Sequence, residues 1–175
     1  MFSDHKKLPG ILLSVFLVLL IQHDALGISI PPLLFLNQSE SLPLGLYARV
    51  PHFSLRNGDI VAYQEPEIIG LSKENGWVPE NAPDHLWMLK HAAVSGTPYR
   101  IGYDNTFSVN GKYIGQISKS DSAGHALPQQ LPGNFTVPDG KFLPYTPAPD
   151  SFDGRYTGVV DCDAIGSRII PIFTW

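Results

Sequence analysis

Proline and glycine interrupt this chain so often that little room is left for long helices. The 175 residues include 16 glycines and 16 prolines. Both residue types favour turns, and proline also removes a backbone hydrogen-bond donor from a helix or a central strand. Hydrophobic residues make up 43% of the chain and charged residues 16%, a mix that suits one globular domain with a sizeable core. The sequence therefore predicts a single, mostly β domain.

Turn signals separate the apolar runs and predict where the strands lie. Asn57-Gly58 and Asn110-Gly111 are pairs typical of tight β-hairpin turns, and Asp139-Gly140 is a third turn signal. Residues 85–93 are compatible with a strand or with a short helical turn. We expect strands at residues 44–50, 59–63, 99–103, 106–109, 112–114 and 134–137.

Three other segments and the end of the chain have a different character. Residues 66–84, 118–133 and 143–154 are rich in proline, glycine and polar residues, so we expect irregular loops there. The tail at residues 169–175 is apolar to its last residue. It predicts either a packed strand or a segment at a membrane surface.

The N-terminus has the pattern of an export signal. Lys6 and Lys7 precede an apolar run at residues 11–21, and Ala25-Leu26-Gly27 follows it. A basic flank, a short apolar run and small residues at its end are typical of a secretory signal peptide. An uncleaved anchor with its basic end in the cytoplasm is an alternative, and a buried helix is another. We expect residues 1–27 to be a signal peptide or membrane anchor, with the rest of the chain outside the cytoplasm.

Charge and metal-binding side chains exclude several classes of function. The formal net charge is -4 and the pI is about 5.8, so we expect no nucleic-acid partner. Cys162 is the single cysteine, which rules out an intramolecular disulfide and suits a small core residue. The six histidines are scattered along the chain, so we expect neither a metal site nor a cofactor.

Two serines stand in a turn ahead of the apolar run at residues 44–50. They are Ser39 and Ser41. A serine nucleophile needs an exposed hydroxyl, a nearby base and donors for the oxyanion, and a turn before a strand provides the exposure. The hydroxyl of Ser39 and the backbone N–H of Ser41 are candidate donors. The alternative is an ordinary serine-rich turn with backbone caps.

One lysine is surrounded by apolar residues. Lys90 lies in the run Leu86-Trp87-Met88-Leu89-Lys90-His91-Ala92-Ala93-Val94. Burial in such a run disfavours the charged amine and lowers its pKa, so that a neutral lysine can accept a proton from a serine. The alternative is a lysine whose stem covers apolar surface while its amine reaches water.

A late segment pairs an acid with a base. Asp153 and Arg155 stand two residues apart in the glycine-flanked stretch Asp150-Ser151-Phe152-Asp153-Gly154-Arg155. The two side chains can form an ion pair that holds the loop in place. Nothing in this pair by itself indicates catalysis.

These three segments, in this order, resemble the conserved boxes of type I signal peptidases, peptidase family S26. That family has a Ser-x-Pro box, an apolar strand ending in lysine and a late Asp-Ser-Arg-Tyr-x-Gly box. The form Ser-x-Pro-x-Gly-x-Tyr resembles its conjugative-transfer, TraF-type branch in particular. The resemblance runs from about Leu36 to the C-terminus. The matching segments are Ser41 to Tyr47, Gly58 to Tyr63, Leu89-Lys90, Val109-Asn110-Gly111, Val137 to Phe142 and Asp153 to Gly158.

The resemblance implies a fold and a set of roles. It implies that residues 28–175 form a signal-peptidase-like antiparallel β domain. In it, Ser41 matches the nucleophile and Lys90 the general base that later acts as general acid. Ser39 matches an oxyanion-hole hydroxyl, and Ser151 matches a serine that orients the lysine.

The late box carries two more implied roles. Asp153 and Arg155 match a structural ion pair near the site, and in the conjugative-transfer branch an aspartate also has a catalytic part. The chain departs from the family at Gly96-Thr97-Pro98, at residues 143–149 and at Gly154, where many relatives carry serine. These departures favour a specialised substrate, such as a pilin precursor, over a general set of secretory preproteins.

The sequence therefore predicts a serine endopeptidase with a Ser-Lys dyad, on the periplasmic side of the inner membrane, that processes an exported precursor protein. If an amine instead of water resolved the acyl-enzyme, the product would be a cyclic peptide. One rival is a catalytically silent component of a conjugation or type IV secretion apparatus. Another is an exported β-rich binding domain unrelated to peptidases, which predicts no contact between Ser41 and Lys90.

Overall fold

The computed structural model describes residues 32–51 and 54–175. The predicted signal peptide or anchor at residues 1–27 lies outside this part and stays a prediction. Among the described residues, no helix is both long and apolar enough to cross a membrane.

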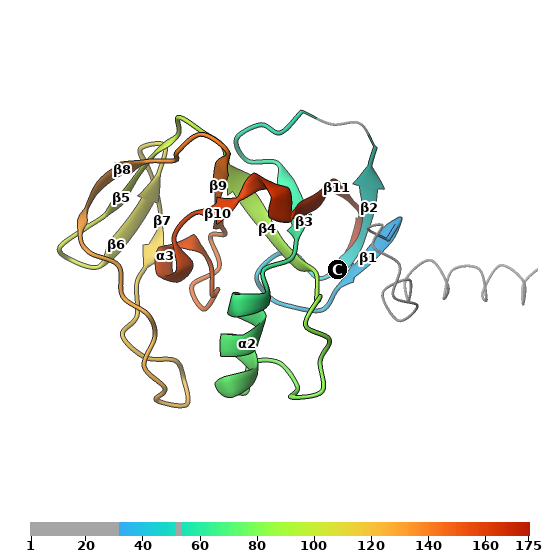
Figure 1. Ribbon diagram of the computed structural model, residues 1–175, viewed down its shortest axis with the longest axis horizontal. Helices are drawn as coiled ribbons and strands as arrows, with labels where there is room; N and C mark the ends of the chain where they lie inside the picture. The colour runs from blue at the N-terminus through green and yellow to red at the C-terminus, as the bar shows by residue number, and fades with distance from the viewer. Residues whose placement is uncertain (1–31, 52–53) are drawn as a thin grey trace, which may run out of the picture.

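Two antiparallel sheets contain the strands of the described chain, and they lie at opposite ends of the molecule (Figure 1). The larger sheet has seven strands, in the spatial order β1 (Leu34–Asn37), β2 (Gly45–Val50), β11 (Ile165–Thr174), β3 (Ile60–Tyr63), β4 (Met88–Ala93), β9 (Lys141–Tyr145) and β10 (Val160–Asp161). The smaller sheet has four strands, in the order β7 (Lys112–Gln116), β6 (Thr106–Val109), β5 (Pro98–Ile101) and β8 (Gly133–Thr136). The prediction of a mostly β, antiparallel domain is confirmed.

Helical structure is scarce, as the proline and glycine content requires. The described helices are α2 (Pro66–Glu74), α3 (Gly154–Thr157) and the 3-10 turn η2 (Cys162–Ala164). α2 and the long segment between β7 and β8 project from the same side of the molecule (Figure 1).

The predicted strands and hairpins are largely confirmed. The turn between β6 and β7 has positive φ at both Asn110 (51°) and Gly111 (73°), the conformation that an Asn-Gly pair adopts in a tight hairpin. The segment at residues 85–93 contains a strand, β4, because Leu89, Ala92 and Ala93 are buried against neighbouring strands. The apolar tail belongs to β11, which pairs with both β2 and β3.

Two of the predicted loops were wrong in part. Residues 66–84 begin with helix α2, where Pro66 occupies the first turn, a position in which proline lacks no needed donor. Burial of Ile68 and Ile69 holds that helix to the core. Residues 143–145 belong to β9, and Pro144 is accommodated there because β10 pairs only with the first two residues of β9.

One smaller expectation also changes. Cys162 is half-buried in η2 and packs at the margin of the cluster around Val61 and Phe142, so it is not a fully buried core residue.

Candidate active site

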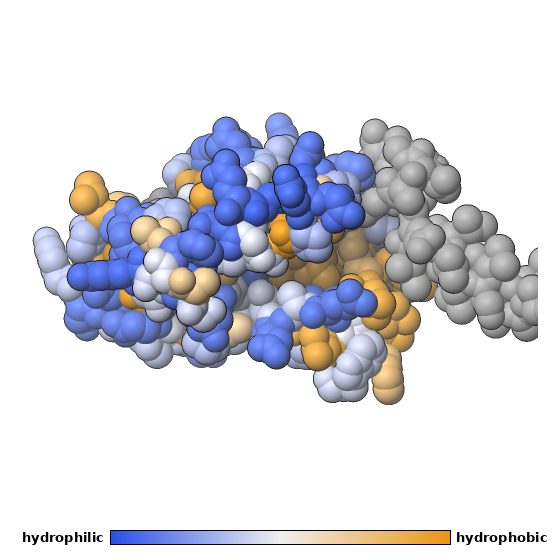
Figure 2. Space-filling view, turned by 90° about the horizontal axis from the view of Figure 1, so that it is seen from below, coloured by the Kyte–Doolittle hydropathy of each residue, from blue (hydrophilic) through white to orange (hydrophobic). Residues whose placement is uncertain are grey.

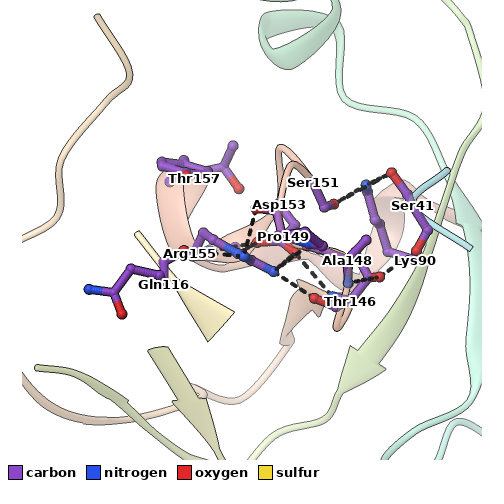
Figure 3. Close-up of polar contacts among 12 residues, drawn as sticks. Ser41, Lys90, Gln116, Thr146, Ala148, Pro149, Ser151, Asp153, Arg155 and Thr157 are labelled. Carbon is purple, nitrogen blue, oxygen red and sulfur yellow. Dashed lines mark hydrogen bonds and ion pairs between the residues drawn. The ribbon is translucent and has the colours of Figure 1, made fainter. Parts of the chain in front are cut away.

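Three side chains from distant parts of the chain meet at one point of the larger sheet (Figure 3). Ser41 lies in the turn between β1 and β2, Lys90 lies in β4, and Ser151 lies in the loop between β9 and α3. The Lys90 Nζ atom is 2.7 Å from Ser41 Oγ and 2.6 Å from Ser151 Oγ. The two hydroxyl oxygens are 3.5 Å apart. The structure thus brings together the residues that the sequence picked out. The contact between Lys90 and Ser41 contradicts the alternative hypothesis of a binding domain unrelated to peptidases, which predicts no such contact.

The amine of Lys90 is unusually easy to deprotonate. Lys90 is 6% exposed, and burial lowers its pKa from 10.5 to about 8. The carboxyl of Asp153 opposes this shift, whereas the guanidinium of Arg155 adds to it. About half of the Lys90 amines are therefore neutral at pH 8, where an exposed lysine is almost fully protonated.

The turn that carries Ser41 is built around one buried amide. Asn37, at the end of β1, is 4% exposed, and its Nδ2 donates to the carbonyls of Ser39 (2.9 Å), Leu42 (3.0 Å) and Pro43 (3.1 Å). Its Oδ1 accepts from the Ser39 backbone N–H at 3.2 Å and from the Ser39 hydroxyl at 3.0 Å. Asn37 thereby determines both the path of the turn and the orientation of Ser39. Sequence reasoning missed it, although asparagine before a serine turn is a known turn former.

Asp153 and Arg155 form a fully buried ion pair behind the site. The Arg155 Nε donates to Asp153 Oδ1 at 2.9 Å and Nη2 donates to Oδ2 at 3.1 Å. The backbone N–H of Arg155 also donates to Oδ1, at 3.0 Å. Burial raises the pKa of the Asp153 carboxyl, and the guanidinium and these hydrogen bonds work against that rise. The predicted ion pair is present, and it anchors the first turn of α3.

The space around Arg155 explains Gly115 in β7. A Cβ atom on Gly115 would lie 2.9 Å from Arg155 Nη1, so only glycine lets β7 approach the guanidinium this closely. The guanidinium also lies over the ring of Phe107, 5.7 Å from its centroid.

A second residue missed from sequence connects the ion pair to the serine. Thr146, just after β9, is completely buried, and its backbone N–H donates to Asp153 Oδ2 at 3.0 Å. Its hydroxyl donates to the carbonyl oxygen of Ser41. In sequence it lies between two prolines in what reads as a loop, and no local signal singles it out.

A cavity of about 600 Å³ opens beside Ser41. Trp77, after α2, and Asp121 both line it, the indole N–H of Trp77 donates to Asp121 Oδ2 at 2.7 Å, and the Trp77 ring lies 4.7 Å from that of Phe152. The loop after α2 and the segment between β7 and β8 therefore form a joint wall. The remaining lining residues are mostly serines and acids: Ser39, Glu40, Ser41, Ser72, Ser118, Ser120, Ser122, Asp150 and Ser151.

The sequence matches the family described as "Signal peptidase, peptidase S26" over residues 10–175. The chain belongs to the peptidase S26 family. Two plasmid transfer proteins TraF from Escherichia coli are similar to it, at 30% identity over 147 residues and 26% identity over 148 residues. Each alignment covers 79% of this chain and 82% of the relative. These relatives put the chain in the TraF-type branch of the S26 family.

Among solved structures, a signal peptidase I from Enterococcus faecalis is similar to this S26 family member at 16% sequence identity and a TM-score of 0.39. That similarity covers 67% of this chain and 98% of the other.

The late box of this chain has glycine at position 154, where many S26 relatives have serine. Local packing explains this difference. A Cβ atom on Gly154 would lie 2.5 Å from the carbonyl oxygen of Pro144 and 2.6 Å from a side-chain carbon of Leu143. A serine would displace β9 from α3. The departure is therefore a matter of local packing and leaves the side chains at the site in place.

Proposed function

We propose that this S26 protein is a serine endopeptidase in which Ser41 is the nucleophile and Lys90 is the general base. The observation that carries the proposal is the 2.7 Å contact between Lys90 Nζ and Ser41 Oγ, made by a lysine whose pKa is lowered to about 8. A neutral amine at this distance accepts the hydroxyl proton as the serine attacks. Ser151 orients the amine by accepting a hydrogen bond from it at 2.6 Å.

The reaction proceeds in two halves. Ser41 Oγ attacks the carbonyl carbon of the scissile peptide bond while Lys90 accepts its proton. The tetrahedral intermediate collapses, the C–N bond breaks, and Lys90 gives the proton to the leaving amine. Water then attacks the ester on Ser41, with Lys90 again accepting a proton, and the serine hydroxyl is regenerated. An amine in place of water would close a new peptide bond and release a cyclic product.

The oxyanion needs donors that face the developing charge. We assign this role to the backbone N–H of Ser41 and to the hydroxyl of Ser39. At rest that hydroxyl donates to Asn37 Oδ1. The Ser39 hydroxyl has to rotate toward the oxyanion during the reaction. Asn37 Oδ1 still accepts a hydrogen bond from the Ser39 backbone N–H after this rotation.

The substrate we propose is an exported precursor protein used in plasmid conjugation, such as a pilin or a related secretion-apparatus subunit. The names of the two TraF relatives, plasmid transfer proteins, support this choice. The rival function is a catalytically silent component of the same apparatus. A buried lysine that has a lowered pKa and contacts a serine favours the enzyme. Burying a lysine costs stability, and a purely structural component does not need that cost.

We propose that the protein works at the membrane on the periplasmic side, with β1 and β11 facing the lipid. β1, β2 and β11 are neighbouring strands at one edge of the larger sheet. Figure 2 shows apolar residues gathered on the right-hand part of the molecule, the end that carries these strands. The large exposed apolar side chains there are Leu33, Leu36, Ile170, Ile172, Phe173 and Trp175. Brominated lipid should quench the tryptophan fluorescence of the native protein through Trp175, and this quenching should be absent from Trp175→Phe. Equal quenching of the two proteins would contradict this placement.

Cleavage of a pilin precursor in detergent tests the enzymatic proposal. We expect Ser41→Ala and Lys90→Ala to abolish cleavage, and the native rate to rise with a midpoint near pH 8 as Lys90 deprotonates. Lys141→Ala is the matched control, since Lys141 pairs with Asp161 at the surface. Activity that survives either of the first two changes would contradict the dyad. An intact fold that never cleaves would favour the silent component.

A further inference from the structure

We propose that Thr146 is a positioning residue that transmits the rigidity of the buried Asp153–Arg155 pair to the nucleophile Ser41. The inference rests on the proposed function of Ser41. It assigns a role to a residue that lies 105 positions from Ser41 in sequence and that shows no motif of its own.

Every polar group of Thr146 is used, and the partners lie on two sides. On one side its N–H donates to Asp153 Oδ2 at 3.0 Å, and its carbonyl accepts from Arg155 Nη2 at 2.6 Å. On the other side its hydroxyl donates to the Ser41 carbonyl and accepts from the Ala148 N–H at 3.2 Å. Thr146 therefore bridges the ion pair and the backbone of the nucleophile (Figure 3).

The hydroxyl is the part of this bridge that acts on Ser41. The backbone bonds of Thr146 would remain if the hydroxyl were replaced by a methyl group, because the ion pair contacts only its N–H and C=O. The carbonyl of Ser41 would then lose the hydrogen bond from the Thr146 hydroxyl. Asn37 would still hold the following residues through the carbonyls of Leu42 and Pro43. The expected result is a folded protein whose nucleophile is imprecisely placed.

The position of Ser41 and the basicity of Lys90 depend on different contacts. The side-chain hydrogen bonds of Thr146 go to Ser41 and Ala148, while the amine of Lys90 contacts Ser41 and Ser151. Removing the Thr146 hydroxyl should therefore slow the attack by Ser41 without moving the pH at which Lys90 loses its proton. A general loss of structure would change both.

The test measures the reactivity of Ser41 directly, with a fluorophosphonate reagent and the full-length protein in detergent. In this reaction Ser41 Oγ displaces fluoride from phosphorus while Lys90 accepts the hydroxyl proton, and mass spectrometry locates the adduct. The variants are Thr146→Val, which has nearly the same shape without the hydroxyl, and Thr146→Ser, which restores it. Thr97→Val is the matched control, since Thr97 is also buried and its hydroxyl donates to Asn57 Oδ1 at 2.7 Å, away from the site.

We expect Thr146→Val to lower the labelling rate by about 10-fold to 100-fold, the range that a misplacement of about 1 Å produces. The final labelled fraction and the pH midpoint should match the native protein, Thr146→Ser should recover most of the rate, and Thr97→Val should react as the native protein does. An unchanged rate in Thr146→Val, a shifted midpoint, or failure of Thr146→Ser to recover the rate would overturn the role of Thr146. Absence of labelling at Ser41 in the native protein would instead overturn the proposed function.

Discussion

The two sheets of this molecule are built for different purposes. In the four-stranded sheet the buried side chains of the strands are apolar or aromatic, including Tyr99, Ile101, Phe107, Val109 and Ile114. The seven-stranded sheet and its adjoining loops bury polar and charged groups: Asn37, Lys90, Thr146, Ser151, Asp153, Arg155 and Ser167. Burying such groups is unfavourable unless each finds a partner. One region therefore contributes chiefly stability, and the other gives up stability for a precise arrangement of polar atoms.

Removing the guanidinium should produce the largest loss of stability. Arg155→Met leaves the Asp153 carboxyl buried without its partner, and the expected loss is about 3–5 kcal/mol in the free energy of unfolding. Urea denaturation measures it. Arg100→Met is the control, because Arg100 is exposed on β5, and it should change stability by less than about 0.5 kcal/mol. Equal effects of the two substitutions would remove the contrast between the sheets.

Truncating a core residue of the smaller sheet should affect stability alone. Ile101, in β5, is 3% exposed, and Ile101→Ala should lower the free energy of unfolding by about 2–5 kcal/mol. At a temperature where the variant is still folded, the labelling rate of Ser41 should equal that of the native protein. A labelling rate that falls along with stability would show that the smaller sheet also positions the site.

Changing the Asn37 amide inside the turn that carries Ser41 should affect both stability and the reactivity of Ser41. Asn37→Leu removes three donated hydrogen bonds, among them the one to the buried carbonyl of Leu42, so we expect a loss of about 1–3 kcal/mol in the free energy of unfolding. Labelling of Ser41 should slow as well. Asn134→Leu, on the exposed face of β8, serves as the control for the same change. A native labelling rate in Asn37→Leu would contradict the account of the turn.

Replacing Lys90 should stabilise the protein, to a degree that depends on pH. The folded-state pKa of Lys90, about 8, lies below the ordinary 10.5, so the unfolded chain binds more protons between these values and native stability rises with pH there. Lys90→Met removes this dependence. We expect it to be more stable than the native protein by about 1 kcal/mol at pH 7, with the advantage shrinking toward pH 10.

Thermal denaturation of both proteins across this pH range measures the difference. A stability difference that stays the same across this pH range would mean that burial does not lower the pKa of Lys90. The same series on Lys141→Met, at a surface lysine, should show no such trend.

Most of the strands could be predicted because local signals agree with the fold. Asn110-Gly111 needs two positive φ values, which these residue types tolerate, and the hairpin formed as expected. The errors came from proline. In sequence Pro66 predicts an irregular segment, whereas in the structure it begins α2, and Pro144 predicts a loop where β9 continues. Whether a proline interrupts an element depends on which backbone donors the neighbours require, and this is not visible locally.

The order of the family boxes in the sequence predicted Ser41, Lys90, Ser151, Asp153 and Arg155 as one constellation. The sequence by itself also determined that a lysine stands within an apolar run and that an acid and a base stand two residues apart. Tertiary structure alone decided the rest. It brought Lys90 within 2.7 Å of a serine 49 residues away, buried it deeply enough to lower its pKa, and placed Asn37 and Thr146 around Ser41. The physical reason is that desolvation and hydrogen-bond partners are properties of the space around an atom, and strands distant in sequence create that space.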